Sequence, residues 1–275
     1  MTQTATSWLT ELTNKYTPSP SQFDAARSHR ASIQACLDYE LGVREMFEIG
    51  SLKHGTGVWL YSDADFLVSL KGVQPQSPWT MLNKVKQSLQ GRFTSTEIVV
   101  RRPAVVCKFS DGSVEIVPAY SATSGYLISD PASDGWMKTY PKDHNDYVSR
   151  VNNKHNGKVK LLARQLKVWK YERHVPVSSC YLEMRAAQHM DGESSYEALW
   201  DLHAVLKKML DANFAAMNDP TGLGSRFGSC SSESNKRDAL SKLERAVTRA
   251  RKARDYARQD NHKNAKEQLA LLFDQ

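Results

Sequence analysis

The chain carries Gly50-Ser51 and then Asp63-Ala64-Asp65-Phe66-Leu67-Val68, and this stretch predicts more about the fold than any other. Asp63 and Asp65 stand two positions apart at the head of an apolar run, so on a strand both side chains lie on the same face. Two neighbouring carboxylates repel each other unless a cation lies between them. A Gly-Ser turn leaves backbone N–H groups that suit a phosphate. The pattern indicates a site for a metal-bound nucleoside triphosphate, and the alternative is an ordinary loop with a solvated Asp pair.

A third acid, Glu115, strengthens the first interpretation. Asp111-Gly112 lies between two apolar runs, residues 105–110 and 113–117, and Asp-Gly in that setting predicts a hairpin. If the second strand of this hairpin pairs beside the strand of the two aspartates, three carboxylates converge. Three acidic groups can hold two Mg²⁺ ions about 3.5–4 Å apart, an arrangement that clamps the attacking and leaving oxygens in phosphoryl transfer.

These residues resemble the pattern of the polymerase-beta-like nucleotidyltransferase superfamily. The resemblance is carried by Gly50-Ser51, Asp63-Ala64-Asp65 and Val114-Glu115-Ile116-Val117-Pro118-Ala119. Within the superfamily, the chain is similar to the cyclic oligonucleotide synthases of bacterial anti-phage defence. Those enzymes are relatives of animal cyclic GMP-AMP synthase and oligoadenylate synthase. One departure is that Glu115 stands where the family usually has Asp, and its extra methylene moves the carboxylate outward.

Later segments fit the same group. Residues 161–170 resemble the family's helix with a phosphate-binding lysine, which gives that role to Lys167. Residues 178–183 resemble the segment whose serine contacts the triphosphate, which gives that role to Ser179. Residues 135–141 are similar to the family's middle connector. The resemblance extends from about residue 40 to the end of the chain.

The resemblance implies an α/β fold with two lobes. One lobe is a polymerase-beta-like nucleotidyltransferase lobe, a mixed sheet with helices, and it is expected at residues 1–157 together with the N-terminal helices. The other lobe is all-helical, similar to the C-terminal helices of oligoadenylate synthases, and it is expected at residues 158–275. The active site is expected in the cleft between them.

The resemblance also implies the reaction. One metal ion, held by Asp63 and Asp65, would bind the triphosphate, and a second, held with Glu115 as well, would lower the pKa of the acceptor hydroxyl. That hydroxyl attacks the α-phosphorus in line and pyrophosphate leaves. The expected ions are two Mg²⁺, with Mn²⁺ as the alternative. The residues expected to bind the nucleotide are Gly50, Ser51, Lys167 and Ser179.

Hydrophobic periodicity gives the expected order of elements. Residues from about 25 to 47 look helical, and residues from about 58 to 120 alternate as strands do, with one helix near 79–90. Residues 121–157 are rich in loop formers and are expected to cross between the lobes. From residue 158 onward the pattern is helical, and it ends in one long helix that begins near residue 240.

One helical face carries a cationic stripe. Its members recur at helical spacing and are Lys160, Arg164, Lys167 and Tyr171. A row of cations that ends in an aromatic ring suits a triphosphate and a base. The alternatives are that the face is merely solvated and that Tyr171 packs in the core.

Composition places the chain among cytoplasmic proteins with polyanionic partners. Lys and Arg number 37 against 30 Asp and Glu, a net charge of +7 that favours nucleotides, RNA or DNA. There is no apolar run of 18 residues and no secretory leader, so no membrane is expected as a partner. The four cysteines are widely spaced, which predicts reduced thiols and argues against zinc. They are Cys36, Cys107, Cys180 and Cys230.

Three classes of function stay open. The first is a second-messenger synthase of anti-phage defence that joins nucleoside triphosphates, with ATP or dATP favoured, into a cyclic or short linear oligonucleotide. It would serve a downstream effector protein that reads the product, and a nucleic-acid activator is a further candidate partner. The second is a nucleotidyltransferase that modifies a macromolecule, such as a tRNA 3′ end or a protein hydroxyl. The third is a nucleic-acid-binding protein with an inactive site, which the intact Gly50, Ser51, Asp63 and Asp65 argue against.

Overall fold

The structure is a computed structural model that describes residues 3–59, 61, 63–131 and 133–275. The strands are β1 Val43–Ile49, β2 Ala64–Leu70, β3 Glu97–Arg101, β4 Ala104–Phe109, β5 Gly112–Ser121, β6 Tyr126–Ser129 and β7 Trp136–Thr139. In the described part of the chain they form a seven-stranded sheet whose main order is β1-β2-β5-β4-β3. Strand β6 pairs with both β5 and β7.

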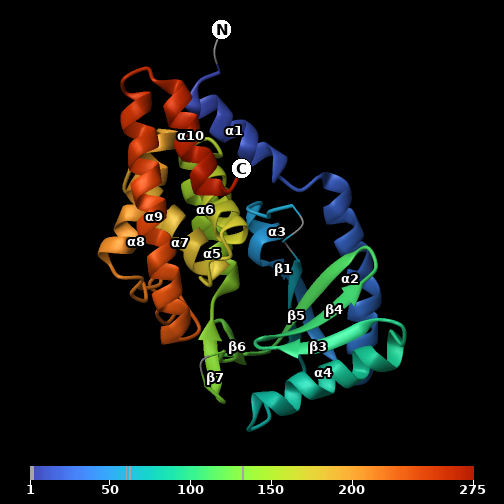
Figure 1. The fold of residues 1–275 in the computed structure, drawn as a ribbon. Coiled ribbons are helices and arrows are strands. Elements are labelled where there is room, and N and C mark those ends of the chain that lie inside the picture. The colour runs from blue at the N-terminus through green and yellow to red at the C-terminus, as the bar shows by residue number, and fades with distance from the viewer. Residues whose placement is uncertain (1–2, 60, 62, 132) are drawn as a thin grey trace.

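The helices separate into two groups (Figure 1). They are α1 Ala5–Lys15, α2 Pro20–Leu41, α3 Gly50–His54, α4 Pro78–Arg92, α5 Pro141–Lys154, α6 Lys158–Glu172, α7 Ser179–Asp191, α8 Ala198–Asp211, α9 Glu233–Ala257 and α10 His262–Phe273. Helices α2 and α4 contact each other and the sheet, while α5 to α10 gather beside it. None of the helices described is long and apolar enough to cross a membrane.

The parallel pair of β2 and β5 positions two of the predicted acids. In its register Asp65 lies opposite Glu115. Strand β5 also forms the hairpin predicted around Asp111-Gly112, because Phe109 at the end of β4 pairs with Gly112. Both the hairpin and the pairing of its second strand with the aspartate strand are therefore confirmed.

Two large hydrophobic cores hold the molecule together. The sheet core lies under α2 and α4 and includes Phe66, Leu82 and Ile116. The helical core joins α6 to α10 and includes Trp169 and Phe273. It also takes in α1 and α5, so it extends across the predicted division at residue 157. Helix α1, which precedes the strands in the sequence, thus packs in the helical core.

Three predicted elements differ from the structure. Residues 43–47, predicted as helix, belong to β1, because Gly42 with φ +71° ends α2 in a left-handed conformation. Residues 121–157, predicted as a loop-rich connector, carry β6, β7 and α5. The predicted long last helix is two helices, α9 and α10, because the chain turns at Asp260, whose φ is +56°.

Candidate active site

Gly50 and Ser51 open the short helix α3, where a turn was predicted. Gly50 has φ +64°, and a Cβ at this position would collide with the Asp65 carboxylate, so the backbone there requires glycine. The backbone N–H of Ser51 donates a hydrogen bond to the same carboxylate. The predicted phosphate-binding segment therefore lies directly against one of the predicted metal ligands.

The other two acids meet through a cation from a third strand. Asp63 immediately precedes β2, and Arg101 is the last residue of β3. The Arg101 guanidinium donates to Asp63 at 3.3 Å and also to Glu115. The structure thus joins Asp63 and Glu115 through Arg101, while Asp65 contacts Gly50. Within the described ranges, no three acidic, histidine or cysteine side chains are already gathered as a metal cluster.

The charge balance around Asp65 is unfavourable for an isolated carboxylate. Burial and the neighbouring Asp63 raise the pKa of Asp65 to about 7, although Lys167 acts in the opposite direction. Burial also raises the pKa of Asp63, and Arg101 offsets part of that rise. Two acids with raised pKa values beside a third form a site that an added cation stabilises.

This set of donors fits a hard divalent cation. Carboxylate oxygens are the protein ligands that Mg²⁺ takes, usually together with waters and phosphate oxygens. Arg101 already lies as a cation between Asp63 and Glu115. A divalent ion would meet the same carboxylates with twice the charge, and the long side chain of Arg101 is exposed enough to move away.

The predicted nucleotide-binding residues Lys167 and Ser179 have different partners. Lys167 is 1% exposed, and its Nζ donates to Glu183 Oε1 at 2.7 Å. Ser179, the first residue of α7, accepts a hydrogen bond of 2.6 Å from Lys170 Nζ. The structure commits Lys167 to an internal ion pair, and this placement does not favour its predicted contact with phosphates.

Lys170 is a candidate phosphate ligand that the sequence analysis missed. It follows Lys167 by three positions on α6 and is more exposed. Burial and repulsion by Lys167 lower the pKa of Lys170 to about 8. The charge of Arg101, the cation that contacts Asp63 and Glu115, lowers this pKa further. The available clue was the spacing, because positions three apart share a helix face.

The cationic stripe of α6 faces the segment that follows α3. Arg164 donates to the carbonyl oxygens of Gly55 at 2.6 Å and Gly57 at 2.8 Å. Tyr171 stacks on Tyr61 with ring centroids 4.5 Å apart. The stripe is therefore not merely solvated, since two of its members hold other parts of the chain.

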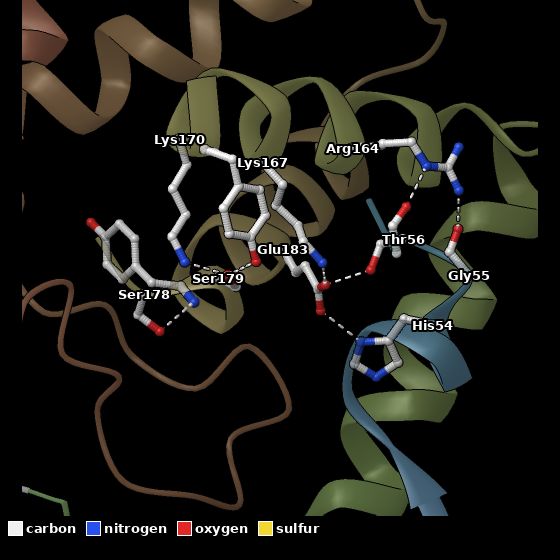
Figure 2. A network of polar contacts seen from close by, with 12 residues as sticks. His54, Gly55, Thr56, Arg164, Lys167, Lys170, Ser178, Ser179 and Glu183 are labelled. Carbon is white, nitrogen blue, oxygen red and sulfur yellow. Dashed lines mark hydrogen bonds and ion pairs between the residues drawn. The ribbon is translucent and has the colours of Figure 1, made fainter. Parts of the chain in front are cut away.

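A further buried acid, Glu183 of α7, had no predicted role. Figure 2 shows it between Lys167 on α6 and His54 on α3. His54 Nδ1, Thr56 Oγ1 and Lys167 Nζ all donate to its carboxylate. The available clue was an acid inside the otherwise apolar run Tyr181-Leu182-Glu183-Met184, all four residues of which are buried.

Comparison with known proteins gives a family match. Residues 1–152, more than half of the chain, match the family model described as Second Messenger Oligonucleotide or Dinucleotide Synthetase domain. The cyclic AMP-AMP-AMP synthase of Acinetobacter sp. (strain ATCC 27244 / 9458) is 29% identical over 167 residues, which are 56% of this chain and 48% of that protein. The chain spans about half the length of the curated relatives it matches.

Solved structures share the fold. CdnC of E. coli MS115-1 with ATP has a TM-score of 0.74 at 17% identity and covers 94% of this chain and 93% of its own. The same protein in its complex with HORMA-deltaN has a TM-score of 0.76 at 17% identity, with coverage of 98% and 96%. The cyclic AMP-GMP synthase DncV of Vibrio cholerae has a TM-score of 0.64 at 14% identity, with coverage of 83% and 68%. The predicted combination of a polymerase-beta-like lobe and a helical lobe is therefore confirmed.

Proposed function

Because this chain belongs to the family of Second Messenger Oligonucleotide or Dinucleotide Synthetases, we propose that it is a metal-dependent nucleotidyltransferase. It would join nucleoside triphosphates into a cyclic or short linear oligonucleotide and release pyrophosphate. The observation that carries this proposal is the parallel register of β2 and β5, which sets Asp65 opposite Glu115 with Asp63 two residues away. Within the described residues, the ion pairs of these three acids are those that Arg101 makes with Asp63 and Glu115.

We assign the divalent ions to Asp63, Asp65 and Glu115, with Mg²⁺ expected and Mn²⁺ as the alternative. When bound, two such ions would neutralise the triphosphate and lower the pKa of the acceptor hydroxyl. Ser51 would keep Asp65 oriented through the backbone hydrogen bond that it already makes. Arg101 would leave the carboxylates and become available to phosphate oxygens, as arginine suits phosphate geometry.

We assign the triphosphate to Gly50, Ser51 and Ser179, with Lys170 as the cation that accompanies Ser179. The 2.6 Å hydrogen bond between Lys170 and Ser179 supports this assignment, because it holds the Lys170 ammonium beside the Ser179 hydroxyl at the start of α7. Both groups can donate to phosphate oxygens. A phosphate contact by Lys167 stays a prediction, since its Nζ would have to leave Glu183. Catalysis would then rest on positioning and on charge neutralisation.

We propose ATP or dATP as the favoured substrate and a downstream effector protein as the reader of the product. Similarity to a cyclic AMP-AMP-AMP synthase and to CdnC solved with ATP supports the adenine nucleotide. The complex of CdnC with HORMA-deltaN supports a role for protein partners in this family. We place the reaction in the cytoplasm and in anti-phage defence, and we keep a nucleic-acid activator as a candidate partner.

The test is incubation of the purified chain with labelled nucleoside and deoxynucleoside triphosphates, Mg²⁺ or Mn²⁺, and no acceptor. Products are identified by liquid chromatography and mass spectrometry. Small phosphatase-resistant oligonucleotides together with pyrophosphate are the expected result. The Asp65→Asn variant serves as the inactive control.

Two other outcomes would overturn the proposal. If label enters RNA or protein only when these are added, the chain modifies a macromolecule such as a tRNA 3′ end or a protein hydroxyl. If wild type and Asp65→Asn release the same amount of pyrophosphate under every condition, including added RNA or DNA, the carboxylates do not support nucleotidyl transfer.

A further inference from the structure

Glu183 is a carboxylate whose partners come from two different parts of the molecule. Its side chain is 4% exposed. One oxygen accepts from His54 Nδ1 at 2.8 Å, and the other accepts from Lys167 Nζ at 2.7 Å and from the Thr56 hydroxyl. His54 and Thr56 belong to the segment after β1, whereas Lys167 lies on α6. Figure 2 shows these donors converging on the one acid.

The donors keep this acid ionised. Burial alone would raise its pKa, but Lys167 and His54 outweigh burial and hold the pKa of Glu183 well below its usual range. The bond to Glu183 is the hydrogen bond of the His54 ring, because within the described residues its buried Nε2 has no hydrogen-bond partner. Among the described residues, the carboxylate is therefore the polar anchor for His54.

The chain passes from one hydrophobic core to the other at this point. Leu52 packs in the sheet core, and Val58 packs in the helical core. Between them, Glu183 holds the side chains of His54 and Thr56. Arg164 holds the backbone of the same stretch through two carbonyl oxygens, at 2.6 and 2.8 Å. Hydrogen bonds thus hold residues 52–58 to α6 and α7 where the chain passes between the two cores.

This passage continues directly from the nucleotide-binding segment. Gly50 contacts the Asp65 carboxylate and Ser51 donates to it, and both precede His54 within α3. We infer that Glu183 is a positioning residue for the proposed nucleotidyl transfer: through His54 and Thr56 it fixes α3 against the helical lobe. Ser51 and Asp65 then lie at a set distance from Lys170 and Ser179. The inference rests on the proposed function, and it assigns Glu183 no contact with substrate.

The chain offers a matched control for this inference. Asp201 of α8 accepts from His189 Nε2 at 2.9 Å, and the two side chains are 3% and 2% exposed. This pair has the same chemistry as Glu183 with His54, a buried carboxylate and an imidazole. It joins α7 to α8 inside the helical core and does not touch residues 52–58. Asp201→Asn therefore removes a comparable buried charge away from the passage.

The experiment compares wild type, Glu183→Gln and Asp201→Asn by hydrogen exchange and by kinetics, well below each melting temperature. Glu183→Gln is expected to speed amide exchange at residues 50–58 and to lower kcat roughly tenfold to a hundredfold, since a small misplacement of reacting groups has effects of that size. Asp201→Asn is expected to lower Tm while exchange at residues 50–58 and kcat stay near wild type. A pair of milder variants adds a rescue: Thr56→Val is expected to lower kcat, and Thr56→Ser, which keeps the hydroxyl, is expected to restore it.

The outcomes separate this inference from the proposed function. Equal loss of kcat in Glu183→Gln and Asp201→Asn would show that Glu183 acts on stability alone and would overturn the inference. Unchanged exchange at residues 50–58 in Glu183→Gln would overturn it as well. If Glu183→Gln does not fold, the Thr56→Val and Thr56→Ser pair decides by the same two measurements. If wild type forms no product, the proposed function fails, while the exchange measurement still shows whether Glu183 fastens the passage.

Discussion

Asp65 on β2 and Glu183 on α7 are two carboxylates at which burial raises the pKa, yet their charges are balanced in opposite ways. Around Glu183 the chain supplies Lys167 and His54, and these bring the pKa below its usual range. Around Asp65, burial and the second acid, Asp63, outweigh the charge of Lys167 and the backbone N–H of Ser51, and the pKa rises to about 7. The first acid is neutralised within the fold, and for the second we propose a bound cation.

The comparison separates acids that complete the fold from acids that serve chemistry. A buried charge is tolerated where the chain itself provides partners, and removing one partner then destabilises the protein. An acid that lacks partners weakens the fold, and such groups cluster at functional sites. The same distinction applies to Lys167 and Lys170 of α6, because Lys167 is paired with Glu183, whereas Lys170 pairs with no acid among the residues that the structure describes.

The largest expected effect comes from removing a charge at the aspartates assigned to the metal ions. Asp65→Asn or Asp63→Asn should lower nucleotide incorporation by about a thousandfold or more, because the metal ions lose a ligand. Without Mg²⁺ the Tm should hold or rise, because repulsion between the two acids is relieved. Product formation at saturating metal and thermal melts in a chelator measure the two effects. Substantial activity in either variant would break the comparison.

Glu115 should show a smaller, graded effect. Glu115→Ala removes the carboxylate beside Asp65 and should lower kcat by about a hundredfold. Glu115→Asp keeps the charge and supplies the residue that the family usually has, so its loss should be milder. The measurement is kcat at saturating Mg²⁺ for both variants. Wild-type turnover by Glu115→Ala would show that this residue is structural and that the third acid lies elsewhere.

The two lysines should respond differently to truncation. Lys170→Ala should raise the KM for nucleoside triphosphate by about tenfold, more than it lowers kcat, because a phosphate contact is lost. Lys167→Ala should instead lower the free energy of unfolding by about 3–5 kcal/mol, because Glu183 is left buried without its cation. Steady-state kinetics and denaturant melts of both variants distinguish the roles. The reverse result would restore the phosphate contact first predicted for Lys167.

The pH dependence of nucleotide binding should follow Lys170. The pKa of this lysine is lowered to about 8, so its ammonium is charged below that pH and neutral above it. If the charge binds phosphate, the KM should rise several-fold as pH rises from about 7 to 9. Lys170→Arg keeps its charge throughout this interval. The variant should therefore show a flat KM profile, and a profile that still rises would assign the effect to another group.

The smallest effect is expected from the basic face of α9. A groove of about 650 Å³ beside α6 and α10 is lined by the cations Arg173, Lys242, Arg245, Arg249 and Lys252. We expect this face to be solvated, so reversing two charges in Arg245→Glu with Arg249→Glu should leave turnover unchanged. Salt titrations of binding to short RNA and DNA provide the measurement. Tight wild-type binding that collapses in the double variant would instead indicate a nucleic-acid activator.

Local pattern was sufficient for the carboxylates of the sheet. Asp111-Gly112 predicted the hairpin of β4 and β5, and the parallel pairing of β5 with β2, considered only as a condition from the sequence, sets Glu115 opposite Asp65. Pattern was insufficient for the strand at residues 43–49, because alternation there also fits one face of a helix. These residues become a strand because they pair with β2, and the residues of β2 follow later in the chain.

Partners distant in sequence account for the rest of what was missed. Helical spacing puts Lys167 and Lys170 on neighbouring positions of one face, and only packing decides which of them is buried. The partner of Glu183 at His54 lies 129 residues away, so no local pattern relates the two. Acids and turns are thus predictable where the adjacent residues in the sequence set their conformation. Ion pairs between lobes are not predictable in this way.

The packing of α1 against α10 has a consequence for the order of folding. These helices contact each other from opposite ends of the chain, and Gln275 Nε2 donates to the Tyr16 hydroxyl at 3.2 Å. During synthesis α1 is made before α10, whereas the buried residues of the sheet core end at Ile116, with Tyr120 and Trp136 packed against them. The sheet with its acids can therefore form first during synthesis. Because α10 also contacts α6, the packing of the helix that carries Lys170 is completed only after α10 has been translated.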